Sequence, residues 1–307
     1  MINKELTDFI SKKLNIARRD LIEKDVALSQ ILFYLMQNKD FSKNYAFKGG
    51  TCLIKCYLGY YRFSEDLDFT YLNQKEFDGM SKKKIRELIS EKIGKLGEII
   101  GIIAKRLDLD FKTEKENRKY TEFGGSNAFV TFKVWHNSKE LEKETFVKIQ
   151  VNHIEKLNYP IKELNAGYIV PKNLEKDFSF LAPEEADILL KPVRVKAYDA
   201  REILIEKVRA ILTRRGIKAR DFIDIFLIME KTKVKLSNLE NSIIDKTKFM
   251  LKYEKYFKNI QDKEKEIDSK LILGEEERLL LIPLPKGFEK FLEEFKPFFR
   301  KLVLALK

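Results

Sequence analysis

The segment of residues 48–72, KGGTCLIKCYLGYYRFSEDLDFTYL, limits the folds open to this 307-residue chain more than any other stretch. A short apolar strand over residues 45–47 leads into two adjacent glycines, and a helix-like run over residues 51–58 follows. A second strand over residues 66–72 alternates apolar with polar side chains. The short helix and its return loop carry the chain back, so the second strand is expected beside the glycine turn in one sheet.

Two aspartates open the second strand. Asp66 and Asp68 are two positions apart, and side chains at i and i+2 of a strand point to the same face of the sheet. Two carboxylates on one face repel each other unless a cation lies between them. A hard divalent ion such as Mg²⁺ takes carboxylate oxygens together with substrate phosphates. The pair therefore predicts a metal site at Asp66 and Asp68.

Gly49, Gly50 and Thr51 supply the features of a phosphate-binding turn. The glycines have no side chains, so their backbone can lie against a triphosphate, and Thr51 adds a hydroxyl at a helix start, where N–H groups favour anions. Each motif alone is weak, because D-x-D occurs by chance and Gly-Gly-Thr also starts ordinary helices. Together they predict metal-dependent phosphoryl chemistry, without a Walker P-loop, since G-x-x-x-x-G-K-[ST] is absent.

The rest of the chain predicts helices around a small mixed sheet, which is an α+β fold with a mainly helical C-terminal part. Apolar periodicity predicts helices over 3–37, 75–105, 200–215 and 219–231, and mostly helix after residue 236. Strands are expected over 127–135, 144–152 and 193–198, the first two as an antiparallel pair. The domain boundary expected from this order separates residues 1–195 from residues 196–307.

The chain carries a formal net charge of +12. This charge favours a polyanionic partner such as nucleic acid, although a Lys-rich composition of the kind found in hyperthermophiles gives the same excess. Residues 201–220 concentrate it, with seven Lys or Arg against two Glu. The two cysteines, Cys52 and Cys56, have no neighbouring His or Cys, which indicates buried thiols in a reducing cytosol rather than zinc. No apolar run predicts a membrane span or signal peptide, so a cytoplasmic location is expected.

These motifs resemble a known family. F-K-G-G-T with Y-R-F-S-E-D-L-D-F, and the later stretch 206–228, EKVRAILTRRGIKARDFIDIFLI, are similar to the signatures of the AbiEii/AbiGii (MenT-like) toxins. The resemblance runs from about residue 46 to residue 229. It implies a DNA-polymerase-beta-like nucleotidyltransferase core, with the helical C-terminal domain contributing to the site.

The resemblance also implies roles for single residues in the first motif. Gly50 and Thr51 match the phosphate-facing turn of the family, beside Gly49. Asp66 matches the first metal carboxylate and Asp68 the second. Ser64 matches a hydroxyl residue that the family places two positions before the first carboxylate.

In the second motif, Lys207 matches a lysine that faces the nucleotide phosphates, and Asp221 an acidic residue that completes the site. Helical spacing places Lys207 and Arg214 on one face, toward a shared anion. For Asp221 the residues leave alternatives open. It can simply stabilise the N-terminus of its helix, as acidic residues do, or pair with Arg214 or Arg220. Asp224, one turn later, can be the acidic residue of the site instead.

One position departs from the pattern. Polymerase-like cores present a third carboxylate from a later strand, and the matching strand, 147–152, has Gln150 there. A glutamine binds metal more weakly than a carboxylate and is no general base. Lys148 shares the face of Gln150 and suits a phosphate better than a metal. His136 and His153 receive no role.

The sequence thus predicts a nucleotidyltransferase toxin of a type IV toxin–antitoxin (abortive infection) system, which uses an NTP with Mg²⁺ or Mn²⁺. The expected acceptor is an RNA 3′ end, with tRNA favoured, and a cognate antitoxin is an expected partner. The triphosphate is assigned to the glycine turn with Thr51, Arg62 and Lys207, and the RNA to Arg214, Arg215 and Lys218. Two alternatives stay open: transfer to a small molecule or protein hydroxyl, including Ser64 itself, and a non-catalytic nucleotide- or RNA-binding protein.

Overall fold

The computed structural model describes residues 4–124, 128–267 and 279–307. The chain forms two compact units. Unit 1 comprises Met1–Glu155 and Ile161–Ala197, and unit 2 comprises Lys156–Pro160 and Tyr198–Lys307. Unit 2 thus consists of the C-terminal part and a short segment that interrupts unit 1.

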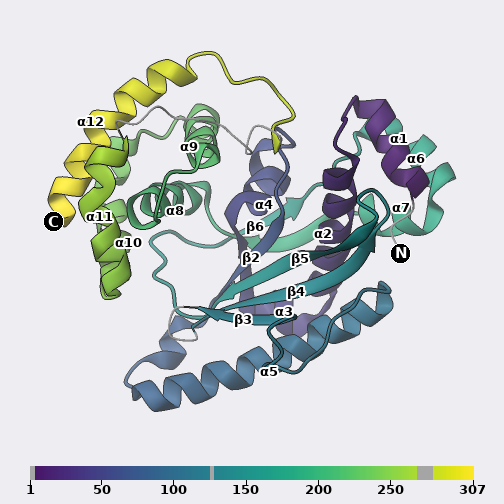
Figure 1. Cartoon of the computed structure of the whole chain (residues 1–307), viewed down its shortest axis with the longest axis horizontal. Coiled ribbons are helices and arrows are strands. Elements are labelled where there is room, and N and C mark those ends of the chain that lie inside the picture. Colours follow the sequence, from purple (N-terminus) through teal and green to yellow (C-terminus); the bar gives the residue numbers. More distant parts are fainter. Residues whose placement is uncertain (1–3, 125–127, 268–278) are drawn as a thin grey trace. The chain divides into compact units, whose positions relative to one another are not determined.

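A seven-stranded mixed sheet is the centre of unit 1, with the order β3-β4-β5-β2-β1-β7-β6. Figure 1 shows β3, β4 and β5 side by side in this sheet. The pairs β2–β5 and β1–β7 are parallel, and the other neighbours are antiparallel. The strands are β1 (Tyr45–Lys48), β2 (Asp66–Tyr71), β3 (Thr121–Gly124), β4 (Phe129–Ser138), β5 (Lys143–Asn152), β6 (Lys162–Ala166) and β7 (Val193–Ala197). The mixed sheet and the helical C-terminal part confirm the predicted α+β class.

The two faces of this sheet differ in polarity. Leu67 and Phe69 of β2 and Ile149 of β5 are fully buried on one face. Helices α2 (Arg19–Gln37) and α5 (Lys82–Arg106) pack against that face, where Ile31 and Ile100 approach Ile149. Successive side chains of a strand point to opposite faces, and the alternate positions of the same strands are mostly polar. The acidic pair of β2 lies on the polar face.

Several expected helices differ from the observed ones. The helix predicted over residues 3–37 is two helices, α1 (Lys4–Leu14) and α2, because Asn15 has a φ of 53° and its left-handed backbone ends α1. The helix predicted over 75–105 is α5, which begins only at Lys82, where the Ser81 side chain caps it. A 3-10 turn, Gln74–Phe77, precedes it.

The helix expected over residues 51–58 begins earlier and changes its winding. The α-helix α4 (Gly49–Leu53) continues as a π-helical turn over Ile54–Leu58, and Gly59, with a φ of 77°, ends it. π-Helical turns often occur at functional sites. Two strands and three α-helices of unit 1 had no counterpart in the sequence prediction: β3, β6, α3 (Lys39–Asn44), α6 (Glu175–Leu181) and α7 (Pro183–Leu189).

Unit 2 is helical. Its helices are α8 (Ala200–Thr213), α9 (Ala219–Thr232), α10 (Glu240–Leu251), α11 (Glu254–Ile267) and α12 (Phe288–Leu306). Phe222 of α9 contacts Phe295 of α12, with ring centroids 5.3 Å apart, in its aromatic core. In the described parts of the chain, no helix combines the length and apolar character that crossing a membrane requires.

The interrupting segment Lys156–Pro160 is held within unit 2 by a buried ion pair. The Glu202 carboxylate accepts hydrogen bonds from the backbone N–H groups of Asn158 and Tyr159, at 2.9 and 2.8 Å. Lys246 Nζ lies 2.5 Å from the other oxygen of Glu202 and donates to the Lys156 carbonyl at 2.8 Å. The hydrogen bonds thus satisfy two charges that are fully buried.

Candidate active site

The predicted metal carboxylates lie side by side on the polar face of β2, between β1 and β5. Asp68 is opposite Lys48 of β1 and Gln150 of β5, and Asp66 is opposite Lys148 of β5. Both carboxylates are half-buried. This placement leaves one flank of the pair next to the glycine turn after β1 and the other flank next to β5.

The glycine turn lies directly against Asp68. Gly49 has a φ of 76°, which side chains rarely tolerate, and a Cβ added there would lie 2.1 Å from Asp68 Oδ2. A Cβ at Gly50 would lie 2.6 Å from Arg62 Nη2 and 3.1 Å from Ser64 Oγ. Only glycines permit this approach, so the turn brings its backbone to a carboxylate, a guanidinium and a hydroxyl at once.

Thr51 connects the glycine turn to strand β2, which carries Asp66 and Asp68. Its side chain is buried, and its hydroxyl donates a hydrogen bond to the Asp66 backbone carbonyl. The hydroxyl therefore fixes α4 against β2. Arg62 is also buried, and its Nη1 donates to the Phe63 carbonyl at 2.7 Å. A bond to the backbone fixes the guanidinium, so its charge is preorganised beside Gly50.

The third carboxylate expected of polymerase-like cores is absent at the matching position. Gln150 stands opposite Asp68, and its Nε2 lies 3.3 Å from Thr131 Oγ1 of β4. Among the described residues, no cluster of three or more His, Cys, Asp or Glu side chains could hold a metal. The Asp66 and Asp68 carboxylates fit a hard divalent ion whose remaining positions are filled by substrate phosphates and water.

The second motif forms a buried charge cluster in unit 2. Lys207 Nζ lies 3.0 Å from Asp221 Oδ1 and 2.7 Å from Asp224 Oδ2, and Arg214 Nη1 lies 2.6 Å from Asp221 Oδ2. Asp224 is fully buried and Asp221 nearly so. Burial alone raises the pKa of Asp221, but the nearby Lys207 and Arg214 outweigh it and hold that pKa below its ordinary value.

The basic residues of the second motif have different surroundings. Lys207 and Arg214 do share a face, and both bind Asp221. Asp224 contacts Lys207 as well, so both acids that the sequence left open belong to the cluster. Arg215 is exposed. Of the predicted RNA-binding residues, Arg214 is engaged with Asp221 and Arg215 faces solvent.

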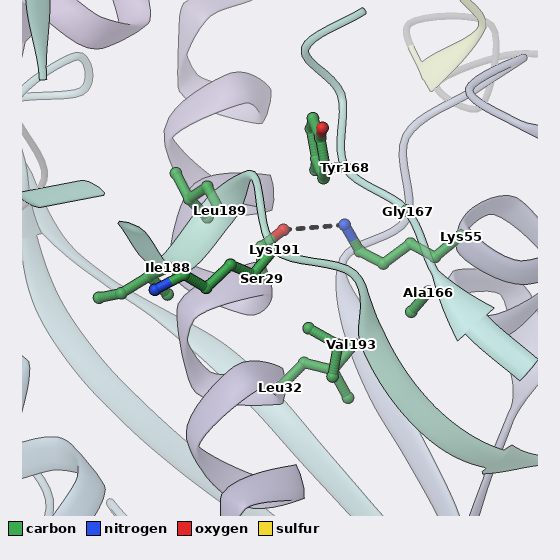
Figure 2. A pocket seen from close by; sticks show the side chains of 10 residues that line it. All are labelled: Ser29, Leu32, Lys55, Ala166, Gly167, Tyr168, Ile188, Leu189, Lys191 and Val193. Carbon is green, nitrogen blue, oxygen red and sulfur yellow. Dashed lines mark hydrogen bonds between the residues drawn. The ribbon is translucent and has the colours of Figure 1, made fainter. Parts of the chain in front are cut away.

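A second buried network in unit 1 was missed by the sequence analysis. Lys55 Nζ lies 3.1 Å from Asp25 Oδ1, 2.8 Å from Ser29 Oγ and within hydrogen-bond distance of the Tyr60 hydroxyl. Tyr60 donates to Asp25 Oδ2 at 2.9 Å, and burial raises its pKa well above the ordinary value. Figure 2 shows Lys55 meeting Ser29 in a small pocket bordered by Tyr168. The network anchors the π-helical turn. Its one sign in the sequence is a lysine, Lys55, within the apolar run of residues 52–58.

Comparisons with known proteins agree with this fold. A sequence model described as "Nucleotidyl transferase AbiEii toxin, Type IV TA system" matches residues 30–303. A search of the curated proteins found no match. MenT4, a nucleotidyltransferase toxin from Mycobacterium tuberculosis H37Rv, is 16% identical, with a TM-score of 0.53 over 98% of this chain and 99% of its own. JHP933 from Helicobacter pylori is 14% identical, with a TM-score of 0.47 over 94% and 93%.

The two kinds of comparison carry different weight. At 16% identity, the likeness to MenT4 concerns the fold alone. The family model spans both motifs, from the glycine turn to the cluster around Lys207. Nucleotidyltransferases of this kind use an NTP and a divalent metal, and a type IV system implies an antitoxin partner. The match over residues 30–303 shows that this chain belongs to the AbiEii family of nucleotidyltransferase toxins of type IV toxin–antitoxin systems.

Proposed function

We propose that this nucleotidyltransferase transfers NMP from an NTP to the 3′-hydroxyl of an RNA, with tRNA as the acceptor. The observation that carries the proposal is the approach of the Gly49 backbone to Asp68, on the face that also presents Asp66. A triphosphate bound along the glycine turn would lie next to the Asp66 and Asp68 carboxylates and the metal ion that they hold. The 3′ oxygen bonds to the α-phosphorus and its proton passes to water, while the bond from the α-phosphorus to the oxygen that bridges to the β-phosphate breaks and pyrophosphate leaves.

The residues of unit 1 have separate roles in this proposal. Asp66 and Asp68 hold the divalent ion, Mg²⁺ or Mn²⁺, which when bound offsets phosphate charge. The Gly49–Gly50 backbone lies along the triphosphate, and the fixed Arg62 guanidinium faces its negative charge. Thr51 keeps the turn against β2, and Ser64 places a hydroxyl beside Gly50.

In unit 2, Lys207 is proposed to face the phosphates, and Asp221 to complete the site. This assignment rests on the family motif. The cluster supports it, because two buried carboxylates hold the Lys207 ammonium in a fixed position. A fixed charge stabilises developing negative charge without reorganisation at the moment of reaction.

The RNA acceptor is supported by charge. The chain carries a formal charge of +12, and the exposed Arg215 lies within the basic segment 201–220. Lys218 and Arg214 extend the proposed RNA surface. NTPs and tRNA are cytoplasmic, so the proposal places the protein in the cytoplasm. A second candidate acceptor is a protein hydroxyl, favoured by one contact, the position of Ser64 beside the glycine turn.

The test uses purified protein, total RNA and each of the four α-³²P-labelled NTPs, with and without EDTA. Label is expected in RNA of tRNA size, only with a divalent metal, and not with the variant Asp66→Asn. Mass spectrometry of the RNA 3′ ends then identifies the added nucleotide. Label on the protein, lost in Ser64→Ala, would assign the acceptor to the protein instead. Label in neither would contradict the proposed transfer.

A further inference from the structure

The polar face of the sheet continues beyond the acidic pair, across β5 and β4. Cross-strand neighbours point to the same face, so the register places Lys148 opposite Asp66, and Lys133 of β4 opposite Lys148. Two residues further along, Phe146 is opposite Trp135. We call these four residues, Lys133, Lys148, Trp135 and Phe146, the β4–β5 platform. Neighbouring strands are about 4.8 Å apart, so the platform begins one strand from Asp66.

Positive charge and aromatic rings are combined on this platform. Lys133 Nζ lies 5.4 Å and Lys148 Nζ 5.7 Å from the centroid of the Phe146 ring. The rings of Phe146 and Trp135 are 4.5 Å apart. All four side chains are only half-buried. Basic groups that pair with phosphates beside rings that stack on bases form the usual surface for single-stranded nucleic acid.

Within residues 4–124, 128–267 and 279–307, Lys148 is the platform lysine that forms no ion pair with a carboxylate. Lys133 is paired with Glu122 of β3. For Lys148, the described part of the chain offers the Phe146 ring and no ion pair. A lysine beside Asp66 would be expected to neutralise that carboxylate if its role were structural. The Lys148 ammonium is therefore available to bind an anion from outside the protein, such as an RNA phosphate.

The flank occupied by the platform matches the acceptor rather than the NTP. The glycine turn follows β1 and lies on the β1 side of Asp68. In an in-line displacement, the attacking and leaving oxygens lie on opposite sides of the phosphorus. With the triphosphate on the β1 side, the attacking 3′ oxygen arrives from the β5 side. Gln150, opposite Asp68, presents an amide there that can accept a hydrogen bond from a ribose hydroxyl.

We propose that the β4–β5 platform binds the single-stranded 3′ end of the acceptor RNA, with Lys148 on a backbone phosphate next to the reacting nucleotide. The inference rests on the proposed function and deepens it, because it assigns the acceptor to a surface of unit 1 distinct from the basic segment 201–220. It also gives Gln150 a reason to stand where an acid is expected, with Lys148 on the same face: both contact the acceptor.

The test compares Lys148→Gln with Lys143→Gln. Lys143 is on the same strand but its side chain points to the opposite face and is exposed, so its variant removes one charge without altering the platform. Affinity for total tRNA is measured at four KCl concentrations, and affinity for the non-hydrolysable analogues of the four NTPs is measured separately. We expect Lys148→Gln to flatten the slope of log affinity against log salt by about 0.7, the single-strand value for one phosphate.

The analogue affinity of Lys148→Gln is expected to stay within about twofold of the wild type, since the NTP lies on the other flank. Phe146→Leu keeps an apolar side chain but removes the stacking surface. It is expected to weaken tRNA binding on the order of fivefold or more at every salt concentration, with the slope unchanged.

Four outcomes would overturn the inference. Identical tRNA affinities and slopes for Lys148→Gln and Lys143→Gln would remove the platform from the RNA site. Weakened analogue binding with unchanged tRNA binding would assign the β5 flank to the NTP. A wild-type protein that neither binds nor labels RNA would overturn both this inference and the proposed function, whereas wild-type labelling that Lys148→Gln fully retains overturns the inference alone.

Discussion

At the scale of single residues, Gly49 is the position where backbone and chemistry depend on each other most. We predict that Gly49→Ala lowers nucleotidyl transfer at least about a hundredfold, because its Cβ would displace the Asp68 carboxylate by direct overlap. Gly59→Ala is the matched control. Gly59 also has a positive φ, 77°, with a ψ of −175°, but among the described residues no atom lies within 4 Å of its added Cβ. Its alanine variant therefore carries only the backbone strain, about 1–3 kcal/mol.

Transfer rates and free energies of unfolding of the two glycine variants separate the effects. Both are expected to lose similar stability from strain, and only Gly49→Ala to lose activity. Equal activities in the two variants would show that the approach to Asp68 is unimportant for the reaction.

The acidic pair makes a second residue-scale prediction. Asp66→Asn or Asp68→Asn should lower transfer at least about a hundredfold, because one fixed charge that acts on the phosphates is lost. Stability should hold or rise slightly, since two like charges on one strand face no longer repel. The control is Asp78→Asn, an exposed aspartate after the same strand. Metal-dependent transfer by Asp66→Asn at the wild-type rate would refute the assignment of this pair.

Sequence analysis works well for residues whose neighbours are near in the chain. The glycine turn and the acidic pair lie within 20 residues of each other, and local spacing was enough to put them together. Lys55 and Lys148 were different. The partner of Lys55, Asp25, lies on another helix, and the neighbours of Lys148 follow from strand register. Sequence periodicity indicates which face of its own helix or strand a residue occupies, but not which side chains of other elements lie next to it.

At the scale of elements, the π-helical turn after α4 depends on a buried ion pair. We predict that Lys55→Met destabilises the protein by about 3–5 kcal/mol, because Asp25 is left buried with its charge uncompensated. The double variant Lys55→Met with Asp25→Asn should recover a large part of this loss. The control, Lys95→Met, removes an exposed cation paired with Glu91 on α5 and should cost at most about 0.5 kcal/mol.

Urea unfolding of these variants gives the free energies of unfolding. If Lys55→Met and Lys95→Met cost the same, Lys55 is not a stabilising partner of Asp25, and the π-helical turn is held by other contacts.

The two strands that escaped prediction have a common cause. Strands β3 and β6 are the two edges of the sheet, and each is short and largely polar. An edge strand has one neighbour, so its sequence needs little of the apolar alternation that identifies a central strand. The division between α1 and α2 rests on the single left-handed residue Asn15, which periodicity on both sides of it does not detect.

For the whole molecule, the prediction concerns salt. If RNA contacts the basic segment 201–220 at about four phosphates, the slope of log affinity against log salt should be near −3 to −4, taking roughly −0.9 per phosphate from duplex DNA. Arg215→Glu should weaken tRNA binding across sequences, because phosphate contacts position an RNA without reading it. Arg215 is a cleaner site than Arg214, which binds Asp221.

Filter binding at several salt concentrations measures these slopes, with Lys235→Glu as the control, an exposed lysine of the same unit. A salt-insensitive affinity, or equal affinities of the wild type and Arg215→Glu, would leave this segment without an RNA role.

The division of the chain also shows where sequence reasoning stops. A boundary at one point of the chain, near residue 195, was expected from the change from strands to helices. The segment Lys156–Pro160 belongs to unit 2 by its contacts with Glu202 and Lys246, although it lies within the strand-rich part of the sequence. Its composition gives no sign of partners that follow more than 40 residues later.

The chain passes between the two units three times, and this has a consequence for synthesis on the ribosome. Strand β7 completes its pairing with β1 only when residue 197 has emerged, about 150 residues after its partner. Segment 156–160 waits still longer for Lys246. A nascent chain that stops before Lys246 carries Asp66 and Asp68 but lacks the lysine that holds segment 156–160, so unit 2 becomes complete only after unit 1 has its strands.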